Sequence, residues 1–369
     1  MHPKLKFTRN AKSGFSDTLK ERVEQYFAEN NLSKHANSFM VFKTVIFLMA
    51  SITFYLLIVF SVFPIVYTLV LAILLGMTMA FIGFNVCHDA LHGSYSPNKK
   101  VNESLGFIFN IMGANPYVWK LTHNVVHHSY TNIVQHDEDI EIAPGLIRVH
   151  ETDKHNSFQR YQHIYAFFLY LLTTLSWFFR KDFLKFFKKQ IGSSYVNKHP
   201  TIEYFNLFFY KLVYYFLFII LPLWVMDLTF SQFLLGYLAM NMAMSLVLGL
   251  VFQLAHVVEN TEIVAPGAAN RMEDSWAVHQ LKTTANFASR SKIAAFLCGG
   301  LNMQVEHHLF PKICHIHYPQ LSEIVRQTAT EFNLPYNENE SFGAAIKSHY
   351  YFLKKMGRQE ETTSSSVFG

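Results

Sequence analysis

Two long stretches of the chain carry almost no charged side chains. Residues 44–86 contain no Lys, Arg, Asp, Glu or His, although Pro64 interrupts them. Residues 205–255 contain only Lys211 and Asp227 as charged residues. A helix needs about 20 apolar residues to cross a bilayer, so each stretch has the length of a helical hairpin. The pattern predicts four membrane spans, near 45–63, 65–84, 208–226 and 228–250.

The N-terminal region, residues 1–43, has the pattern of an amphipathic helix. Leu19, Val23 and Phe27 follow one another at a spacing of four, which gives one apolar face among polar neighbours. These residues lie in a segment that is too charged for a signal peptide. We expect a helix that lies on the membrane surface.

Two further segments, at 107–119 and 164–179, are rich in aromatic residues, and the second leads into a run of cations. Such an arrangement favours in-plane helices whose cations lie among lipid headgroups. A fifth and a sixth span stay open, but they have to come as a pair. The polar tail, residues 357–369, is expected to be disordered.

The composition supports a membrane protein. Hydrophobic residues make up 51% of the 369 residues and charged residues only 15%, against about 25% charged in soluble domains. The formal charge of +5 is modest, and the basic residues form no stripe of the kind that binds nucleic acid. We therefore predict an all-α integral membrane protein with two hairpins and a cytosolic helical cap. Its regions are a cytosolic amphipathic segment (1–43), the first hairpin (44–86), a cytosolic loop (87–204), the second hairpin (205–255), a cytosolic C-terminal region (256–356) and the tail (357–369).

The positions of the basic residues predict the orientation. Of the 31 Lys and Arg residues, eight lie in 1–43, twelve in 97–204 and ten in 271–369, whereas the two hairpin turns hold none. Loops that carry Lys and Arg stay on the cytoplasmic side. Both termini and the middle loop are therefore expected in the cytoplasm, at a bacterial inner membrane or the endoplasmic reticulum.

The sequence lacks the motifs of several common catalytic and metal sites. Cys87, Cys298 and Cys314 show no C-x-x-C spacing, so the sequence gives no sign of a zinc knuckle or a disulfide framework. There is no glycine-rich phosphate loop, no G-x-S-x-G and no H-E-x-x-H. Nucleotide-dependent and serine-hydrolase chemistries therefore have no support.

The 19 histidines include three clusters, HDALH at 88–92, HNVVHH at 123–128 and QVEHHLFP at 304–311. His88 follows the second predicted span and the single His256 follows the fourth. Residues i and i+4 share one face of a helix, so the first cluster and the pair His123 and His127 can each direct two imidazoles at one point. His128, about 100° further round, can reach a second metal.

Eight imidazoles exceed the four ligands that a zinc ion usually takes. Imidazole binds Zn, Cu, Fe and Ni, so the ligand type alone does not select the metal. Eight nitrogens shared by two ions leave positions open for oxygen, and a non-haem di-iron site is the economical interpretation. The predicted ligands are His88, His92, His123, His127, His128, His256, His307 and His308.

Other polar residues are assigned to the surroundings of the metal. Gln304, three residues before His307, is either a weak amide ligand or a hydrogen-bond donor to a ligand. Asp89, His279 and His136 are candidate hydrogen-bond partners of the ligands. Asp137, Glu138 and Asp139 either orient imidazoles or form a solvated loop. The remaining histidines are assigned structural or surface roles.

The three clusters resemble the histidine boxes of the membrane fatty acid desaturases. The resemblance extends over about residues 80–335 and includes WAVHQLKTTANF (276–287) and HYPQLSEIVRQ (317–327). Gln304 in place of the first histidine of the third box is similar to the front-end desaturases and their bacterial relatives. Many eukaryotic members carry a cytochrome b5 domain with an HPGG haem motif, and this sequence has no such motif.

The resemblance implies a desaturase that uses two iron ions and O2 to form a cis double bond in the acyl chain of an acyl-CoA or a lipid. No side chain removes hydrogen from an unactivated methylene, so no separate nucleophile is expected and the cofactor supplies the oxidant. Two electrons are expected from a separate ferredoxin- or cytochrome-b5-type protein with its reductase. The residues that bind substrate are not indicated.

Two alternatives stay open. A membrane di-iron hydroxylase would use the same ligands and return oxygen to carbon. A metal-binding membrane receptor or sensor without catalysis would need the histidines but no acyl chain.

Overall fold

The computed structural model describes residues 5–8, 14–140, 143–191, 194–195, 198–267 and 270–358. Within these ranges helices dominate, as predicted. The strands are two-residue pairings: β1 (Lys6–Phe7) with β4 (Arg271–Met272), β2 (Gln190–Ile191) with β3 (Ser194–Tyr195) and β5 (Asn286–Phe287) with β6 (Glu338–Asn339). Most of the tail predicted to be disordered lies outside the described residues.

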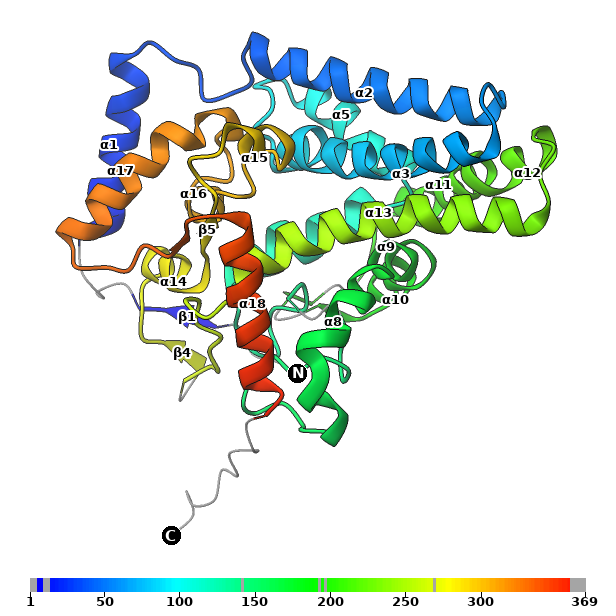
Figure 1. The fold of residues 1–369 in the computed structure, drawn as a ribbon. Coiled ribbons are helices and arrows are strands. Elements are labelled where there is room, and N and C mark those ends of the chain that lie inside the picture. Colours follow the sequence, from blue (N-terminus) through cyan, green and yellow to red (C-terminus); the bar gives the residue numbers. More distant parts are fainter. Residues whose placement is uncertain are drawn as a thin grey trace.

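Four helices in the described part of the chain are long and apolar enough to cross a membrane, which agrees with the predicted four spans. Figure 1 shows them extending together from one end of the molecule. They are α2 (Ser38–Val59); α3 (Ile65–Ile82) continued by the π-helix η1 (Gly83–His88) and α4 (Asp89–His92); α11 (Thr201–Tyr215) continued by η5 (Phe216–Ile220) and α12 (Leu221–Val225); and α13 (Phe230–His256).

The boundaries of these helices differ from the hydropathy pattern in one instructive way. The second and fourth helices continue past the predicted ends at 84 and 250 and carry His88, His92 and His256 within them. The second helix stops where Gly93 adopts a positive φ of 77°. Hydropathy marks where apolar side chains end, whereas a helix ends where its backbone turns away.

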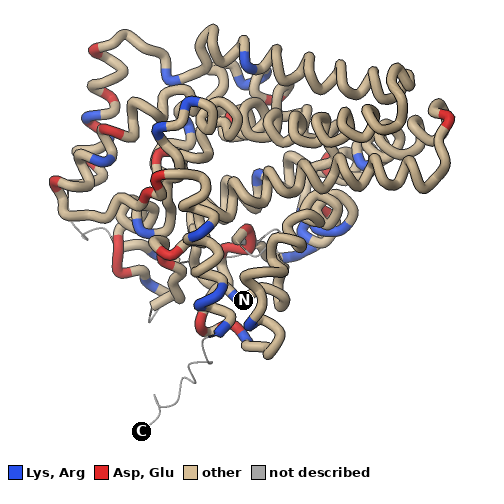
Figure 2. Tube along the Cα trace, viewed as in Figure 1, with Lys and Arg blue, Asp and Glu red and all other residues tan. Residues whose placement is uncertain are grey.

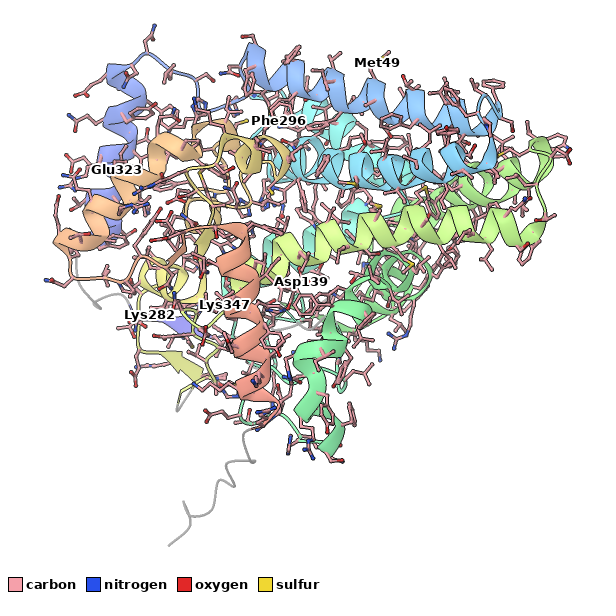
Figure 3. All side chains as sticks on the ribbon, in the orientation of Figure 1. Met49, Asp139, Lys282, Phe296, Glu323 and Lys347 are labelled. Carbon is pink, nitrogen blue, oxygen red and sulfur yellow. The ribbon has the colours of Figure 1, made fainter. Side chains whose placement is uncertain are left out.

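The outer faces of the long helices are apolar and exposed, as a lipid environment requires. Val45, Met49, Ile52 and Leu56 form an exposed stripe on α2, and Met49 projects outward in Figure 3. Figure 2 shows few charges along these helices and many in the part of the molecule that contains α1, α14 and α17. An apolar surface of this extent is rare on a soluble monomer.

The first and second hairpins meet where α3 packs against α13. Gly76 makes this contact close, because a Cβ placed there would lie 2.0 Å from the carbonyl oxygen of Met240. Small residues allow such approaches between membrane helices. The contact fixes the two helices that carry His88, His92 and His256.

The apolar face of helix α1 (Phe15–Glu29) packs on protein, so the expectation that this face lies on the membrane surface was wrong. Its apolar residues Phe15, Leu19, Val23 and Phe27 are buried in a core shared with α17 (Tyr318–Glu331). The apolar face of α1 is therefore covered by α17. Sequence periodicity identifies an apolar face but not the surface that covers it.

The predicted in-plane segments are each divided into shorter helices. Residues 107–119 belong to α5 and α6, separated by a turn in which Gly113 has a φ of 98°. Residues 164–179 run through α8, α9 and η4. The remaining elements are α5 (Lys99–Ile111), α6 (Pro116–Trp119), η2 (Lys120–His127), α7 (His128–Tyr130), η3 (Ser157–Tyr161), α8 (Gln162–Tyr170), α9 (Thr173–Ser176), η4 (Trp177–Lys181), α10 (Asp182–Phe186), α14 (Trp276–Thr283), α15 (Lys292–Leu297), α16 (Gln304–Leu309), η7 (His315–His317) and α18 (Phe342–Met356).

We predict that Gly76→Ala destabilises the protein, because its methyl group collides with backbone at the α3–α13 contact. Overpacking of this kind costs about 1–3 kcal/mol. The matched control is Gly236→Ala in α13, where a Cβ meets no atom within 4 Å. Thermal unfolding in detergent measures both variants, and equal melting temperatures would contradict this account of the contact.

Candidate metal centre

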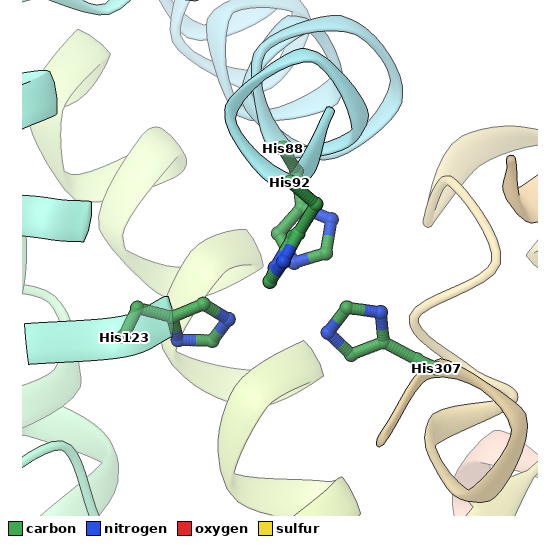
Figure 4. A group of neighbouring side chains, drawn as sticks. All are labelled: His88, His92, His123 and His307. Carbon is green, nitrogen blue, oxygen red and sulfur yellow. The ribbon is translucent and has the colours of Figure 1, made fainter. Parts of the chain in front are cut away.

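Four imidazoles from three parts of the chain converge on one point. His88 lies at the end of η1, His92 at the end of α4, His123 in η2 and His307 in α16. One nitrogen from each lies within 4.8 Å of the others, and Figure 4 shows the rings facing a common centre. We call these four residues the first histidine group.

A second histidine group lies beside the first and consists of His127, His256 and His308. The ring of His127 lies 4.7 Å from that of His256 and 4.9 Å from that of His308, measured between centroids. The single His256, chosen in the sequence for its place after a span, therefore lies among the clustered histidines.

His128 lies between the two groups. Its Nε2 is 3.0 Å from Nε2 of His307 and 3.3 Å from Nε2 of His123, and its ring stacks on His308 with centroids 4.4 Å apart. The eight predicted ligands thus lie together: seven form the two adjoining groups, and His128 lies between them.

The expectation that His123 and His127 share one point was wrong. Their rings stack nearly parallel with centroids 5.0 Å apart, so the two imidazoles stand side by side and face different groups. Both residues lie in the π-helix η2, whose winding differs from the α-helix assumed from the spacing. π-helical turns are frequent at functional sites, and η1 places His88 in the same way.

Burial keeps most of these imidazoles neutral. Loss of water lowers the pKa of His123 to about 3, and together with neighbouring imidazoles it holds the pKa of His128, His307 and His308 well below the usual value. His127 is different, because Asp137 outweighs the effect of burial and raises its pKa. A neutral imidazole is the form that binds a metal.

Outward-facing nitrogens are held by hydrogen bonds. Nδ1–H of His127 donates to Oδ2 of Asp137 (2.8 Å), and Nδ1–H of His308 donates to Oε1 of Gln280 (2.7 Å). Nδ1 of His307 lies 3.2 Å from the hydroxyl of Tyr318. Such contacts fix the tautomer and the ring orientation of a metal ligand.

Asp139 connects the first group to a cation. Its Oδ2 lies 3.5 Å from Nδ1 of His123, and its Oδ1 accepts a hydrogen bond from Nζ of Lys185 at 3.0 Å. Burial opposes ionisation of Asp139, but Lys185 and His123 outweigh it and lower the carboxyl pKa. Asp137 and Asp139 therefore orient imidazoles, whereas Glu138 pairs with the exposed Lys188.

The donor set fits metal ions, because several of the buried ring nitrogens have no hydrogen-bond partner. An unpaired buried polar atom costs about 1–3 kcal/mol, which coordination to a metal would remove. The nitrogens without a hydrogen-bond partner include both of His88, Nε2 of His92, His127 and His308, and Nδ1 of His128 and His256.

The four other polar residues predicted near the metal each have a different partner. Gln304 directs Nε2 to within 2.9 Å of Nε2 of His256, and its buried Oε1 has no partner. His279 bonds the backbone carbonyl of Thr131 and touches no predicted ligand by hydrogen bond. Asp89 pairs with His315, and its Oδ1 lies 3.9 Å from Nδ1 of His88. His136 bonds the carbonyl of Val134.

The sequence reasoning missed three aromatic residues at the site. Trp119 stacks on His123 with centroids 4.4 Å apart, Phe252 lies 4.9 Å from His256, and Tyr318 contacts His307. Trp119 stands four residues before His123 and Phe252 four before His256, so helical spacing from the predicted ligands was a usable signal.

Glu306, inside the third cluster, faces away from the metal groups. Its carboxylate accepts hydrogen bonds from Asn286 (2.8 Å) and Tyr336 (2.9 Å), which hold α16 in place. Burial raises the Glu306 pKa to about 7. Its role is to anchor the helix that carries His307 and His308.

A cavity of about 190 Å³ opens beside the first histidine group. His88, His123 and Gln304 form one part of its lining, and Phe109, Met112 and Leu248 contribute to its mostly apolar walls. Charged residues that include Lys181 and Lys185 also line the cavity. The cavity therefore combines a metal-ligand wall, an apolar body and a charged part.

Comparisons with known proteins agree on one family. The family model described as "Fatty acid desaturase" matches residues 63–340. The sn-1 linoleoyl-lipid 6-desaturase of Synechocystis sp. is 36% identical over 96% of this chain and 98% of its own length. The acyl-lipid (8-3)-desaturase of Physcomitrium patens is 34% identical over 96% of this chain and 74% of its own. An sn-1 linoleoyl-lipid 6-desaturase of Arthrospira platensis is 34% identical over 97% of this chain and 96% of its own.

We predict that Asp137→Asn weakens metal binding, because the amide no longer stabilises the imidazole of His127 as a charged carboxylate does. Loss of such a contact typically costs about 10–100-fold in metal affinity. Metal content after dialysis against increasing chelator measures the effect.

Asp274→Asn is the matched control for this variant. Asp274 pairs with Lys282, belongs to neither histidine group and is partly exposed. The two variants should differ clearly in retained metal. Equal retention would remove Asp137 from the metal site.

Proposed function

The chain belongs to the fatty acid desaturase family, and on this premise we propose that its eight clustered histidines bind two iron ions and that the adjacent cavity holds the acyl chain. Its activity is that of a membrane fatty acid desaturase, an oxidoreductase that introduces a double bond into a fatty acyl chain. The observation that supports the placement is the shared wall, since His88 and His123 belong both to the first histidine group and to the cavity.

Iron, when held by these histidines, would supply the chemistry for the O2-dependent removal of two hydrogens, which no side chain can perform. O2, two electrons and two protons are consumed together with the two hydrogens of the acyl chain, so one double bond and two waters result. The protein neutralises and orients the ligands: Asp137, Gln280 and Tyr318 hold His127, His308 and His307 by their outer nitrogens. Seven of the eight proposed ligands are buried and His92 is partly buried, which limits their contact with water.

The walls of the cavity decide which carbon atoms reach the metal. Phe109, Met112 and Leu248 offer apolar contacts and no hydrogen-bond donor, which suits a methylene chain. An apolar wall distinguishes chains by length and shape, at about 1–3 kcal/mol for each methylene. Positioning, rather than acid–base catalysis, is thus the task of these side chains.

We propose a lipid-linked acyl chain as substrate. The segment 177–187 borders the cavity through Trp177 and Lys181, while Phe179, Leu184 and Phe187 are exposed. Exposed aromatic and aliphatic side chains beside cations are typical of a membrane surface. An acyl chain of a membrane lipid can then enter the cavity without leaving the bilayer.

The relatives support the same substrate class and suggest the position of the bond. Two of them are named sn-1 linoleoyl-lipid 6-desaturases and another is named an acyl-lipid (8-3)-desaturase. We propose that this protein acts at carbon 6 of a lipid-linked chain. The relatives' names do not favour the hydroxylase alternative, and a receptor without catalysis would leave the apolar cavity beside the first histidine group without a role.

The electrons are proposed to come from a separate ferredoxin- or cytochrome-b5-type protein with its reductase. The distribution of Lys and Arg supports an arrangement in which both termini and the metal groups face the cytoplasm. Such a soluble donor is then on the same side as the site. This arrangement fits a bacterial inner membrane or the endoplasmic reticulum.

We predict that cells expressing the protein with a ferredoxin and its reductase accumulate acyl chains lighter by two hydrogens, with the new double bond at carbon 6. Mass spectrometry of intact lipids and of acyl-CoA identifies the carrier. His308→Ala, which lacks one imidazole of the second group, should give no product while still reaching the membrane. A gain of one oxygen atom would instead support hydroxylation, and product found first in acyl-CoA would contradict the lipid-linked substrate.

We also predict that Leu248→Ala shifts the preference toward longer acyl chains, because it enlarges the apolar part of the cavity. With about 1–3 kcal/mol at stake for each methylene, the ratio of C20 to C18 product should rise at least about fivefold. Leu250→Ala is the matched control, since Leu250 lies two residues away on α13 and does not line the cavity. An unchanged product ratio in Leu248→Ala would place the acyl chain elsewhere.

A further inference from the structure

A buried hydrogen-bonded chain leads from the first membrane helix toward His88. Nζ of Lys43, in the second turn of α2, lies 3.0 Å from Nε2 of His315. Nδ1 of His315 lies 2.9 Å from Oδ2 of Asp89, the residue that follows His88. Lys43 and Asp89 are each 1% exposed and His315 is 3% exposed. Residues 43, 89 and 315 are far apart in the sequence. Their side chains are thus connected by hydrogen bonds in the buried interior of the protein.

With Lys43 and Asp89 both charged, one arrangement of protons satisfies these hydrogen bonds with a neutral imidazole. The ammonium of Lys43 donates to Nε2 of His315, so Nδ1 of His315 carries the ring proton and donates to Asp89. The backbone N–H of His315 also donates to the same carboxylate oxygen, at 3.2 Å. A positive and a negative charge are therefore linked through a neutral ring, and Oδ2 of Asp89 is held from two directions.

The hydrogen-bonded series Lys43–His315–Asp89 is not a third metal site. Asp89, Cys314 and His315 lie close enough together to be considered as ligands. However, both ring nitrogens of His315 are engaged, one with Asp89 and the other with Lys43. A metal cation bound there would also lie close to the ammonium group, which like charges disfavour.

Burying the charged side chain of Lys43 at this position costs free energy, so interactions that offset this cost are expected. A charged side chain in a membrane helix is expensive and usually faces the interior of the protein with a partner. Here the aromatic rings of Phe39 and Phe296 lie 5.9 Å and 5.1 Å from Nζ. Phe296, labelled in Figure 3 on α15, also contacts Phe47 of α2. Cation–π contacts lower the cost of burial, but the hydrogen bond leads toward His315.

The second carboxylate oxygen of Asp89 lies near a proposed metal ligand. This Oδ1 is 3.9 Å from Nδ1 of His88, and neither ring nitrogen of His88 has a hydrogen-bond partner. By contrast, His127 has Asp137, His308 has Gln280 and His307 has Tyr318 as outward partners. Asp89 is an acceptor of the same kind beside His88.

We propose that Lys43 and His315 are positioning residues that hold Asp89 so that it accepts a hydrogen bond from Nδ1–H of His88 when Nε2 of His88 binds iron. The inference rests on the proposed function of the histidine groups. According to this inference, the geometry of the first histidine group depends on α2 and on η7, although neither element supplies a ligand. Among the described residues, no hydrogen bond joins Lys43, His315 or Asp89 to the second histidine group.

The test compares iron spectra of full-length protein loaded with ⁵⁷Fe. In Lys43→Met and His315→Phe, we expect the Mössbauer signal of one iron to change while the other is unaffected. The altered iron should also be lost to a chelator about 10-fold more readily. His315→Asn keeps a side-chain N–H for Asp89, and it should restore much of the wild-type spectrum.

His317→Phe is the matched control, because His317 lies on the same 3₁₀ turn but bonds the backbone carbonyl of His35 at 3.3 Å. A merely structural effect of changing this turn would appear in the control or in both iron signals. Two bound irons with unchanged spectra in Lys43→Met and His315→Phe would overturn this inference alone. A wild-type protein without iron would overturn the proposed function, and this inference with it.

Discussion

The packing of eight imidazoles in one place, most of them buried and several with an unpaired nitrogen, is the constraint on which the rest of this structure depends. A buried nitrogen without a partner would destabilise the fold in the absence of a metal. The protein offsets this by holding the opposite nitrogens of several rings through Asp137, Gln280 and Tyr318. The site is thus a set of hydrogen-bonded rings pointed at two adjoining positions.

This constraint explains why the membrane helices extend beyond what lipid requires. The second and fourth helices continue to His92 and His256, so the same rigid rods that cross the bilayer also position ligands. Gly76 lets these two helices approach closely. α16 then brings His307 and His308 to them, anchored from behind by Glu306. A shift of α16 would therefore displace one histidine of each group.

The same geometry connects the metal groups to the membrane. The cavity beside His88 and His123 has apolar walls and a charged part near Lys185, and Lys185 is itself paired with Asp139 behind His123. Lys43, on the first membrane helix, reaches Asp89 behind His88 through His315. Two residues of the first histidine group thus lie beside ionic contacts, which are buried at Lys43 and partly exposed at Lys185.

The sequence by itself determined the four spans, the predominance of helices and the set of eight histidines, because uncharged length and clustered imidazoles are local properties of the chain. Tertiary structure decided how the histidines divide, that α1 packs on α17 rather than on lipid, and that Lys43 belongs to the interior. These outcomes depend on contacts between residues far apart in the chain. They also depend on π-helical winding at Gly83–His88 and Lys120–His127, which residue spacing does not reveal.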